Sequence, residues 1–200
     1  MTCTIDYQVV EPHYVDTTVE VLTERDRWPH GYLGLFFATI VEAPAYSGVT
    51  FRGFDSSLEL GRHNPWIYFN GYGGKPGLTV HPSGVSRPEL GRPTDPPDVY
   101  YYSDSSIRFV EPFFFGRVND MVFGVLFRGC DRERVRFTVN PLSGFGSPAW
   151  DFFWIIEDPE LGQMYTLPFR VLFKPFVSGE DILTEFRAYA STSHGVAQTG

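Results

Sequence analysis

The stretch RVRFTVN, residues 134–140, decides the fold class of this chain. Apolar and polar residues alternate along it with a period of two, which is typical of a β-strand with one buried face. We expect its apolar residues to be buried, namely Val135, Phe137 and Val139. We expect Arg134 and Arg136, on the opposite face, to be exposed to solvent.

Similar β-rich runs, separated by turn-forming residues, recur along the whole chain. They predict strands at residues 17–23, 33–41, 48–54, 65–70, 77–81, 106–111, 113–118, 121–128, 149–157 and 165–174. Segment 33–41 is apolar on both faces, so we expect a central strand, with 48–54 pairing back onto it. A polar turn joins 121–128 to 134–140, and these two segments are predicted to form a hairpin.

One helix is predicted, over residues 179–190, with Ser178 as its N-cap. About ten short strands and one helix indicate an all-β fold, an antiparallel β-sandwich of jelly-roll type with one short C-terminal helix. We expect a single domain spanning residues 1–200. Within it, the proline-rich segment 82–98 is predicted to be a long loop and 191–200 a flexible tail.

Charge and composition narrow the classes of function. The chain has 16 basic and 24 acidic residues, a net charge of −8, which disfavours binding to nucleic acid. No run approaches the roughly 20 apolar residues of a membrane span, and no signal peptide is evident, so we expect a cytoplasmic protein. The two cysteines, Cys3 and Cys130, and the five histidines show no metal-ligand spacing. We therefore expect neither a metal site nor a cofactor.

Three long segments carry a resemblance to a protein family: EPFFFGRVNDMVFGVLF from Glu111, RVRFTVNPLSGFGSPAWDFFWII from Arg134 and YTLPFRVLFKPFVSGEDIL from Tyr165. They resemble a group of bacterial β-sandwich proteins with a PAWDF-type strand motif. That group is distantly similar to sugar-handling sandwiches of the galactose-mutarotase or lectin-like kind. The chain is much shorter than aldose mutarotases and shows no counterpart of their two histidines and glutamate, so the resemblance implies sugar handling but no catalytic residues.

Asp151 is the first candidate for a role in chemistry, because it lies between Trp150 and Phe152 in an otherwise apolar strand. A charge in such surroundings needs a partner or an open cleft. A carboxylate beside aromatic rings suits a sugar, whose hydroxyl groups donate to the carboxylate while its C–H face stacks on a ring. The alternative is a structural ion pair with Arg117 or Arg170.

Three other polar residues complete the candidate site. Arg117 follows Gly116, which we interpret as a bend or bulge that turns the arginine toward a cleft. The alternative is an arginine at a hairpin end, paired with Asp120 or Glu111. Glu111 itself is a candidate second carboxylate for binding or acid–base work. His81 precedes the proline-rich loop, where it is either a proton-transfer group or a structural histidine.

Aromatic residues supply the candidate stacking surface. Trp66, Tyr68 and Tyr72 surround a glycine-rich turn, where small residues let a ligand approach the backbone. Trp150 lies beside Asp151. The alternative for all of them is ordinary packing in the core.

The sequence supports three hypotheses about function. The first is a carbohydrate- or glycoside-binding sandwich, with an enzymatic version in which Asp151, Arg117 and His81 are catalytic and Trp66, Tyr72, Trp150 and Glu111 bind substrate. The second is a non-catalytic accessory subunit that assembles with a sugar-processing enzyme. The third is a structural homo-oligomer whose aromatic residues pack at an interface.

Overall fold

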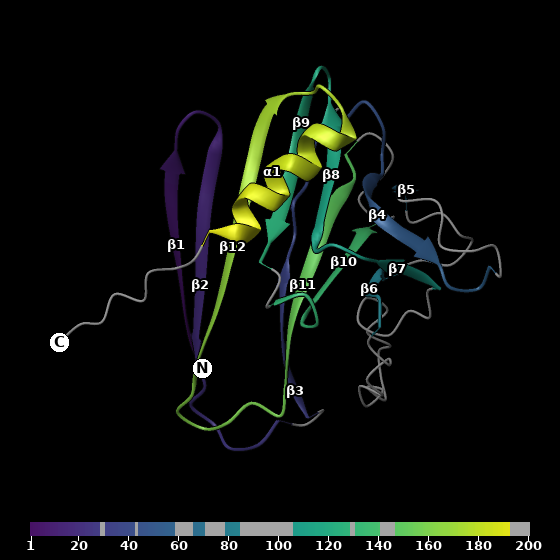
Figure 1. Ribbon diagram of the computed structural model, residues 1–200. Helices are drawn as coiled ribbons and strands as arrows, with labels where there is room; N and C mark the ends of the chain where they lie inside the picture. Colours follow the sequence, from purple (N-terminus) through teal and green to yellow (C-terminus); the bar gives the residue numbers. More distant parts are fainter. Residues whose placement is uncertain are drawn as a thin grey trace.

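The chain forms two unequal β-sheets packed face to face, with a helix on the outside of the larger one (Figure 1). The computed structural model describes residues 1–28, 31–42, 44–58, 66–70, 79–84, 106–128, 131–140 and 147–192. The predicted all-β class and C-terminal helix are confirmed. The more specific jelly-roll topology stays a prediction.

The larger sheet has nine strands. Eight of them follow the order β1 (Thr2–Val10), β2 (Tyr14–Leu22), β12 (Met164–Pro175), β9 (Met121–Phe127), β8 (Phe113–Val118), β4 (Val49–Asp55), β7 (Ile107–Phe109) and β6 (His81–Pro82). The ninth, β5 (Trp66–Phe69), pairs with β4 beside this row. The pairing of β6 with β7 is parallel, whereas the other strand neighbours in this sheet run antiparallel.

The smaller sheet has three strands, in the order β10 (Val135–Asn140), β11 (Ala149–Glu157) and β3 (Tyr32–Phe37). Its inner face packs on the larger sheet through an aromatic core. The fully buried aromatic residues of this core are Phe51, Phe109, Phe114, Phe127, Phe137, Trp150 and Trp154. Burial of this much apolar surface is the main force holding the two sheets together.

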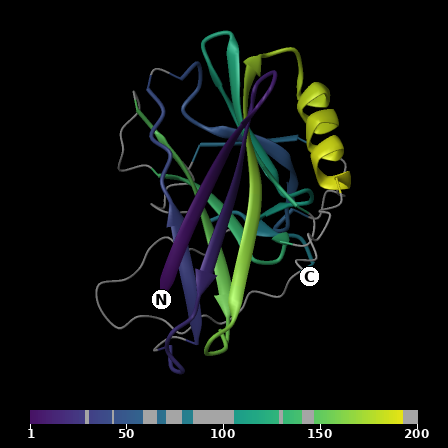
Figure 2. The same ribbon diagram turned by 90° about the vertical axis from the view of Figure 1, so that its left-hand side faces the viewer.

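The helix α1 (Gly179–Ser191) covers the outer face of the larger sheet, on the side away from the smaller sheet (Figure 2). Ser178 caps it as predicted, because its hydroxyl accepts a hydrogen bond from the backbone N–H of Asp181 at 3.1 Å. The apolar face of α1 is buried against β8, β9 and β12. Its buried residues are the four on the predicted helical face, Ile182, Leu183, Phe186 and Tyr189.

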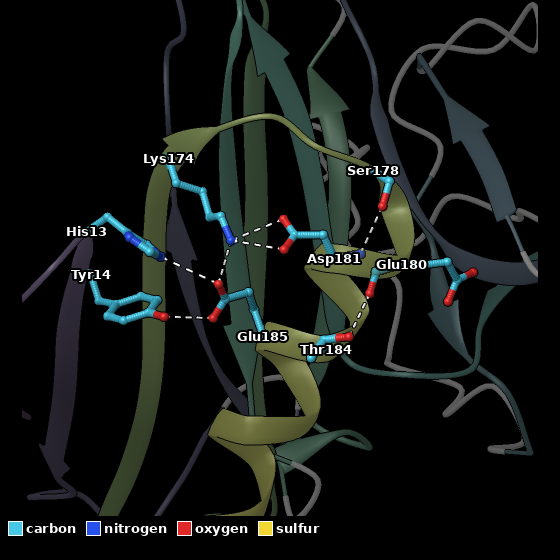
Figure 3. A network of polar contacts seen from close by, with 8 residues as sticks. All are labelled: His13, Tyr14, Lys174, Ser178, Glu180, Asp181, Thr184 and Glu185. Atoms are coloured by element: carbon cyan, nitrogen blue, oxygen red, sulfur yellow. Dashed lines mark hydrogen bonds and ion pairs between the residues drawn. The ribbon is translucent and has the colours of Figure 1, made fainter.

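A polar network fixes the first turns of α1 to the sheet (Figure 3). Lys174 on β12 donates to Asp181 at 3.1 Å and to Glu185 at 2.6 Å. The hydroxyl of Tyr14 donates to Glu185 at 2.7 Å, and His13 lies 3.5 Å from the same carboxylate. Burial acts to raise the pKa of Glu185, but the hydrogen bonds from Lys174 and Tyr14 outweigh it, so that pKa lies below its usual value.

The predicted central position of segment 33–41 is wrong. Strand β3 lies at the edge of the smaller sheet and pairs with β11. It is apolar on both faces because Phe37 stacks on Phe152 in the core at 4.5 Å, while Phe36 packs on Phe153 on the other face at 5.1 Å. Phe36 is nevertheless 45% exposed, so an apolar run on both faces indicated neither burial of both faces nor a central place in the sheet.

Two predicted strand pairings are also wrong. Segment 121–128 does not form a hairpin with 134–140, because β9 pairs with β8 and β12 in the larger sheet and β10 with β11 in the smaller. Segment 48–54 does not pair with 33–41, because β4 lies in the larger sheet and pairs with β5, β7 and β8. In both cases the short connection crosses from one sheet to the other.

Strand β10 follows its predicted alternation only in part. Its three apolar residues are buried and Arg134 is exposed, as expected. The prediction of a solvent-exposed Arg136 is wrong, because only 3% of this residue is accessible. Its guanidinium donates to the carbonyls of Glu133 and Val135 at 2.6 and 2.8 Å, and burial lowers its pKa to about 10. The second face of β10 is therefore buried as well.

The edge strand β1 was not predicted from the sequence. It pairs with β2 over its whole length and is exposed at almost every residue. Ile5, Tyr7 and Val9 lie opposite inward-facing residues of β2, yet they are 41%, 69% and 78% exposed. Each of these residues therefore extends beyond the part of the core that the smaller sheet covers.

Candidate functional site

A pocket of about 510 Å³ lies on the outer face of the larger sheet, where β8, β4 and β5 meet the N-terminus of α1. Five aromatic side chains line it: Tyr46, Trp66, Tyr68, Phe115 and Phe176. The remaining lining residues are Gly48, Thr50, Gly116, Arg117 and Gly179. The sheet thus provides the floor of the pocket, and the segment leading into the helix provides one wall.

The strand register explains why these side chains converge. Thr50 on β4 lies opposite both Phe115 on β8 and Tyr68 on β5. Residues opposite one another in antiparallel strands project from the same face of the sheet. Because side chains alternate along a strand, Trp66 and Arg117, each two residues away from a member of this row, project from that face too. The alternation visible in the sequence therefore places both on the pocket side.

Trp66 forms the inner aromatic wall. Its ring packs edge-on against Phe115 at 5.9 Å, and its indole N–H donates to Glu180 at 3.2 Å. Phe176 stacks on the same phenylalanine at 6.1 Å. A side chain at position 179 would lie 3.0 Å from the tryptophan ring, so Gly179 allows the helix to begin directly against it. Packing on both sides holds these rings in place.

Tyr46 and Tyr68 stand at the mouth of the pocket, 59% and 51% exposed. Their rings meet edge to face at 6.3 Å. The Tyr68 hydroxyl accepts a hydrogen bond from the backbone N–H of Gly48 at 3.0 Å. This contact uses an acceptor site of the hydroxyl and leaves its own hydrogen to donate to a ligand.

Among the described residues that line this pocket, Arg117 is the only one with a charged side chain. Its guanidinium carbon lies 4.7 Å from the centre of the Phe176 ring, and it donates to the carbonyl of Asn119 at 3.4 Å. The alternative pairing with Glu111 is wrong, because Glu111 instead lies 3.5 Å from Arg52. Nor does Arg117 form an ion pair with Asp120 in the described part of the chain.

Gly116 is not the bend or bulge that we predicted, because β8 pairs with β9 in unbroken register through this residue. The glycine is needed for a different reason. A Cβ atom at this position would lie 2.2 Å from the ring of Trp150, which is fully buried in the smaller sheet. The indole N–H of Trp150 donates to the carbonyl of Ser47 at 2.9 Å, which holds the ring there. Trp150 thus packs behind the pocket floor and does not line it.

We expect Gly116→Ala to lower the free energy of unfolding by about 1–3 kcal/mol, the usual cost of overpacking a core. The added methyl group would have to displace the anchored Trp150 ring. Chemical denaturation measures the effect. A fully stable Gly116→Ala protein would contradict this packing.

Asp151 is buried to 0% exposure and does not line the pocket. One carboxylate oxygen accepts a hydrogen bond from the backbone N–H of Thr39 at 3.2 Å, and the other has no hydrogen-bond partner. Burial raises its pKa to about 6. The alternative ion pair with Arg117 or Arg170 is wrong, since Arg170 holds Asp16 with two hydrogen bonds of 2.5 and 2.7 Å. A ligand role for Asp151 stays a prediction.

The other predicted residues are dispersed. His81 is 8% exposed on β6, opposite Arg108, and lies outside the pocket lining. Glu111 is near the pocket face through its contact with Arg52, which lies opposite Trp66 in the β4–β5 register. Tyr72 and most of segment 82–98 lie outside the described residues. Of the predicted residues, the structure brings together Trp66, Tyr68 and Arg117.

Three aromatic pocket residues were missed in the sequence. Phe115 could have been found, because it alternates with Arg117 along one strand. Tyr46 and Phe176 lie outside the strands, so no periodicity marks them. Tyr46 precedes β4 and Phe176 precedes α1, and the two residues meet only because the fold brings these two segments together at the pocket.

The fold and the pocket together define an all-β sandwich with an aromatic-lined pocket that contains one arginine among its described lining residues. No protein-family model and no curated protein matches the chain. Among the described residues, no group of three or more histidine, cysteine or acidic side chains is arranged to hold a metal ion. The same part of the chain contains no helix with the length and apolar character needed to span a membrane.

Proposed function

We propose that the pocket beside α1 binds a carbohydrate or glycoside. The observation that carries the proposal is the set of five aromatic side chains around an open space of about 510 Å³. That volume lies in the usual range of small-molecule sites, about 300–1,000 Å³. Aromatic faces stack on the C–H face of a sugar ring, while Thr50, Tyr68 and Arg117 offer hydrogen bonds at the margin of the pocket.

The side chains in this pocket stack and form hydrogen bonds, so the proposal concerns binding. Two carboxylates that contact pocket residues or their neighbours already have partners: Glu180 accepts from the indole of Trp66, and Glu111 pairs with Arg52. A sugar-processing reaction that uses Asp151 and His81 stays a separate prediction, because neither residue lines the pocket.

The test is calorimetric titration of the intact protein with a panel of methyl glycosides and disaccharides. Tyr46→Ala and Tyr68→Ala remove exposed stacking surface at the mouth of the pocket, and we expect each to weaken binding roughly five- to tenfold. Tyr7→Ala is the matched control, because this exposed tyrosine lies on β1, outside the pocket. The affinity of the Tyr7→Ala protein for the sugar should equal that of the wild type.

Two results would refute the proposal. One is a panel in which no sugar binds at millimolar concentration. The other is sugar binding that both pocket variants leave unchanged while Tyr7→Ala reduces it.

Self-association or assembly with an enzyme subunit also stays a prediction. The feature that favours it is the exposed apolar row Ile5, Tyr7 and Val9 on the edge strand β1, since such edges can pair with another strand. Light scattering on the purified protein tests self-association, and a monomer at high concentration would speak against it.

A further inference from the structure

We propose that the sugar bound in this pocket carries an acidic group and that Arg117 binds that group. This inference rests on the proposed function and names the class of ligand: an acidic sugar, with a carboxylate or a phosphate on the ring. Arg117 is then the residue that distinguishes acidic from neutral sugars.

Arg117 has unused hydrogen-bonding capacity. A guanidinium has five N–H donors, and the contact with a protein acceptor is the 3.4 Å bond to the carbonyl of Asn119. Its Nε atom is shielded from solvent and has no hydrogen-bond partner. By contrast, Arg170 in the same sheet directs Nε and an Nη atom to the two oxygens of Asp16. Arg117 lacks such a carboxylate within the described residues.

A ligand anion would supply what is missing. Because Nε is shielded, a ligand anion in the pocket would accept from the terminal Nη groups, and a hydrogen bond between charged groups is stronger than one between neutral groups. The planar guanidinium matches the two oxygens of a carboxylate or phosphate. Its position over the Phe176 ring holds the group in place, so less side-chain freedom is lost on binding.

The surroundings of the pocket agree with an anionic ligand. Gly179, the first residue of α1, lines the pocket, so the positive end of the helix dipole lies at its rim and adds to the attraction. Of the two acidic residues in the first turn, Asp181 is paired with Lys174, whereas Glu180 accepts from the neutral indole of Trp66 and keeps its charge, so Arg117 attracts the anion against this carboxylate. The chain as a whole carries a net charge of −8, so Arg117 supplies a local positive charge on a molecule that otherwise repels anions.

The test compares neutral and acidic versions of the same sugars by calorimetry. The neutral probes are the methyl β-glycosides of glucose and galactose. The acidic probes are the methyl β-glycosides of glucuronic and galacturonic acid, and the 6-phosphates of glucose and galactose. We expect at least one acidic probe to bind the wild type roughly tenfold more tightly than its neutral counterpart, the usual gain from a charge-assisted contact. Comparing the uronic acid glycosides with the sugar phosphates shows whether the pocket prefers a carboxylate or a phosphate.

Variants of Arg117 then identify the residue responsible. Arg117→Gln keeps a polar side chain but removes the charge, and we expect it to abolish the preference for the acidic probe, with a smaller loss of affinity for the neutral glycoside. Arg117→Lys should retain part of the preference. Arg134→Gln is the control, because Arg134 is exposed on the loop before β10, outside the pocket. Melting temperatures of all variants verify that they fold.

The outcomes separate this inference from the proposed function. Equal binding of neutral and acidic sugars by the wild type would overturn the inference and leave the proposed function standing. An acidic preference that survives in Arg117→Gln would also overturn the assignment to Arg117. Failure of every probe to bind would refute both proposals.

Discussion

Replacing Phe137 by alanine is expected to lower the free energy of unfolding by about 3–5 kcal/mol, as for other large buried aromatic residues. Phe137 is fully buried between the two sheets. Its ring meets Phe51 edge-on at 4.9 Å, stacks on Phe109 at 4.9 Å and contacts Phe114 at 5.2 Å. These three rings come from β4, β7 and β8, so they cannot all move to fill the cavity that the substitution leaves.

Denaturant unfolding measures this loss, and Phe173→Ala provides the matched control. Phe173 lies on β12 and is 48% exposed, so we expect its replacement to cost less than about 1 kcal/mol. Similar losses for the two variants would mean that the core does not lie where the structure places it.

Asp151→Asn is expected to have an effect of the opposite sign, stabilising the protein by about 1–3 kcal/mol at pH 8, because the unpaired amide donors offset part of the gain from removing the charge. Burial raises the pKa of the carboxyl from 3.8 to about 6, so the folded state holds this proton more tightly than the unfolded chain does. Ionisation therefore favours unfolding. Asparagine has nearly the same shape and can still accept the hydrogen bond from Thr39, but it carries no charge.

The pH dependence of this effect follows from the two pKa values. Below about pH 4 the carboxyl is protonated in both states, so its charge contributes nothing to the difference between wild type and variant. Between about pH 4 and 6 the wild type loses the stability that the proton provides, and above about pH 6 the full difference remains.

Thermal or chemical unfolding at pH 4 and pH 8 provides the measurement, with the exposed Asp6→Asn as control. If Asp6→Asn changes the stability little at both pH values, the pH-dependent difference between the wild type and Asp151→Asn is due to the burial of Asp151. A loss of stability in Asp151→Asn at pH 8 would show that the ionised carboxylate has a stabilising partner, and it would contradict the unpaired oxygen seen in the structure.

The candidate site shows how far sequence reasoning can locate a pocket. Trp66 and Tyr68 were named because they flank a glycine-rich turn, and Arg117 because of a predicted bulge that the structure does not contain, yet all three line one pocket. Asp151, Trp150 and His81 were named from their neighbours in the sequence, and they lie outside its lining. Alternation specifies which residues share a face of one strand, but it does not specify which strands lie side by side.

Burial of the second face of β10 has a similar origin. The alternation of residues 134–140 correctly predicts that Phe137 faces the core. It cannot reveal that the opposite face, with Arg136, is also shielded, because polar residues are tolerated in a buried face once their donors are paired. Whether a polar face meets solvent depends on what packs against it, and that is a tertiary property.

The sequence by itself determined the all-β class, the places of most strands and the capped helix that begins after Ser178, because these depend on local periodicity and local hydrogen bonds. Only the tertiary structure decided that β9 and β10 lie in different sheets, that β3 is an edge strand, and that a pocket forms beside α1. The physical reason is that neighbouring strands bond through main-chain groups, which are alike in nearly every residue. The choice of partner strand is therefore made by long-range packing of side chains such as Phe137 and Trp150.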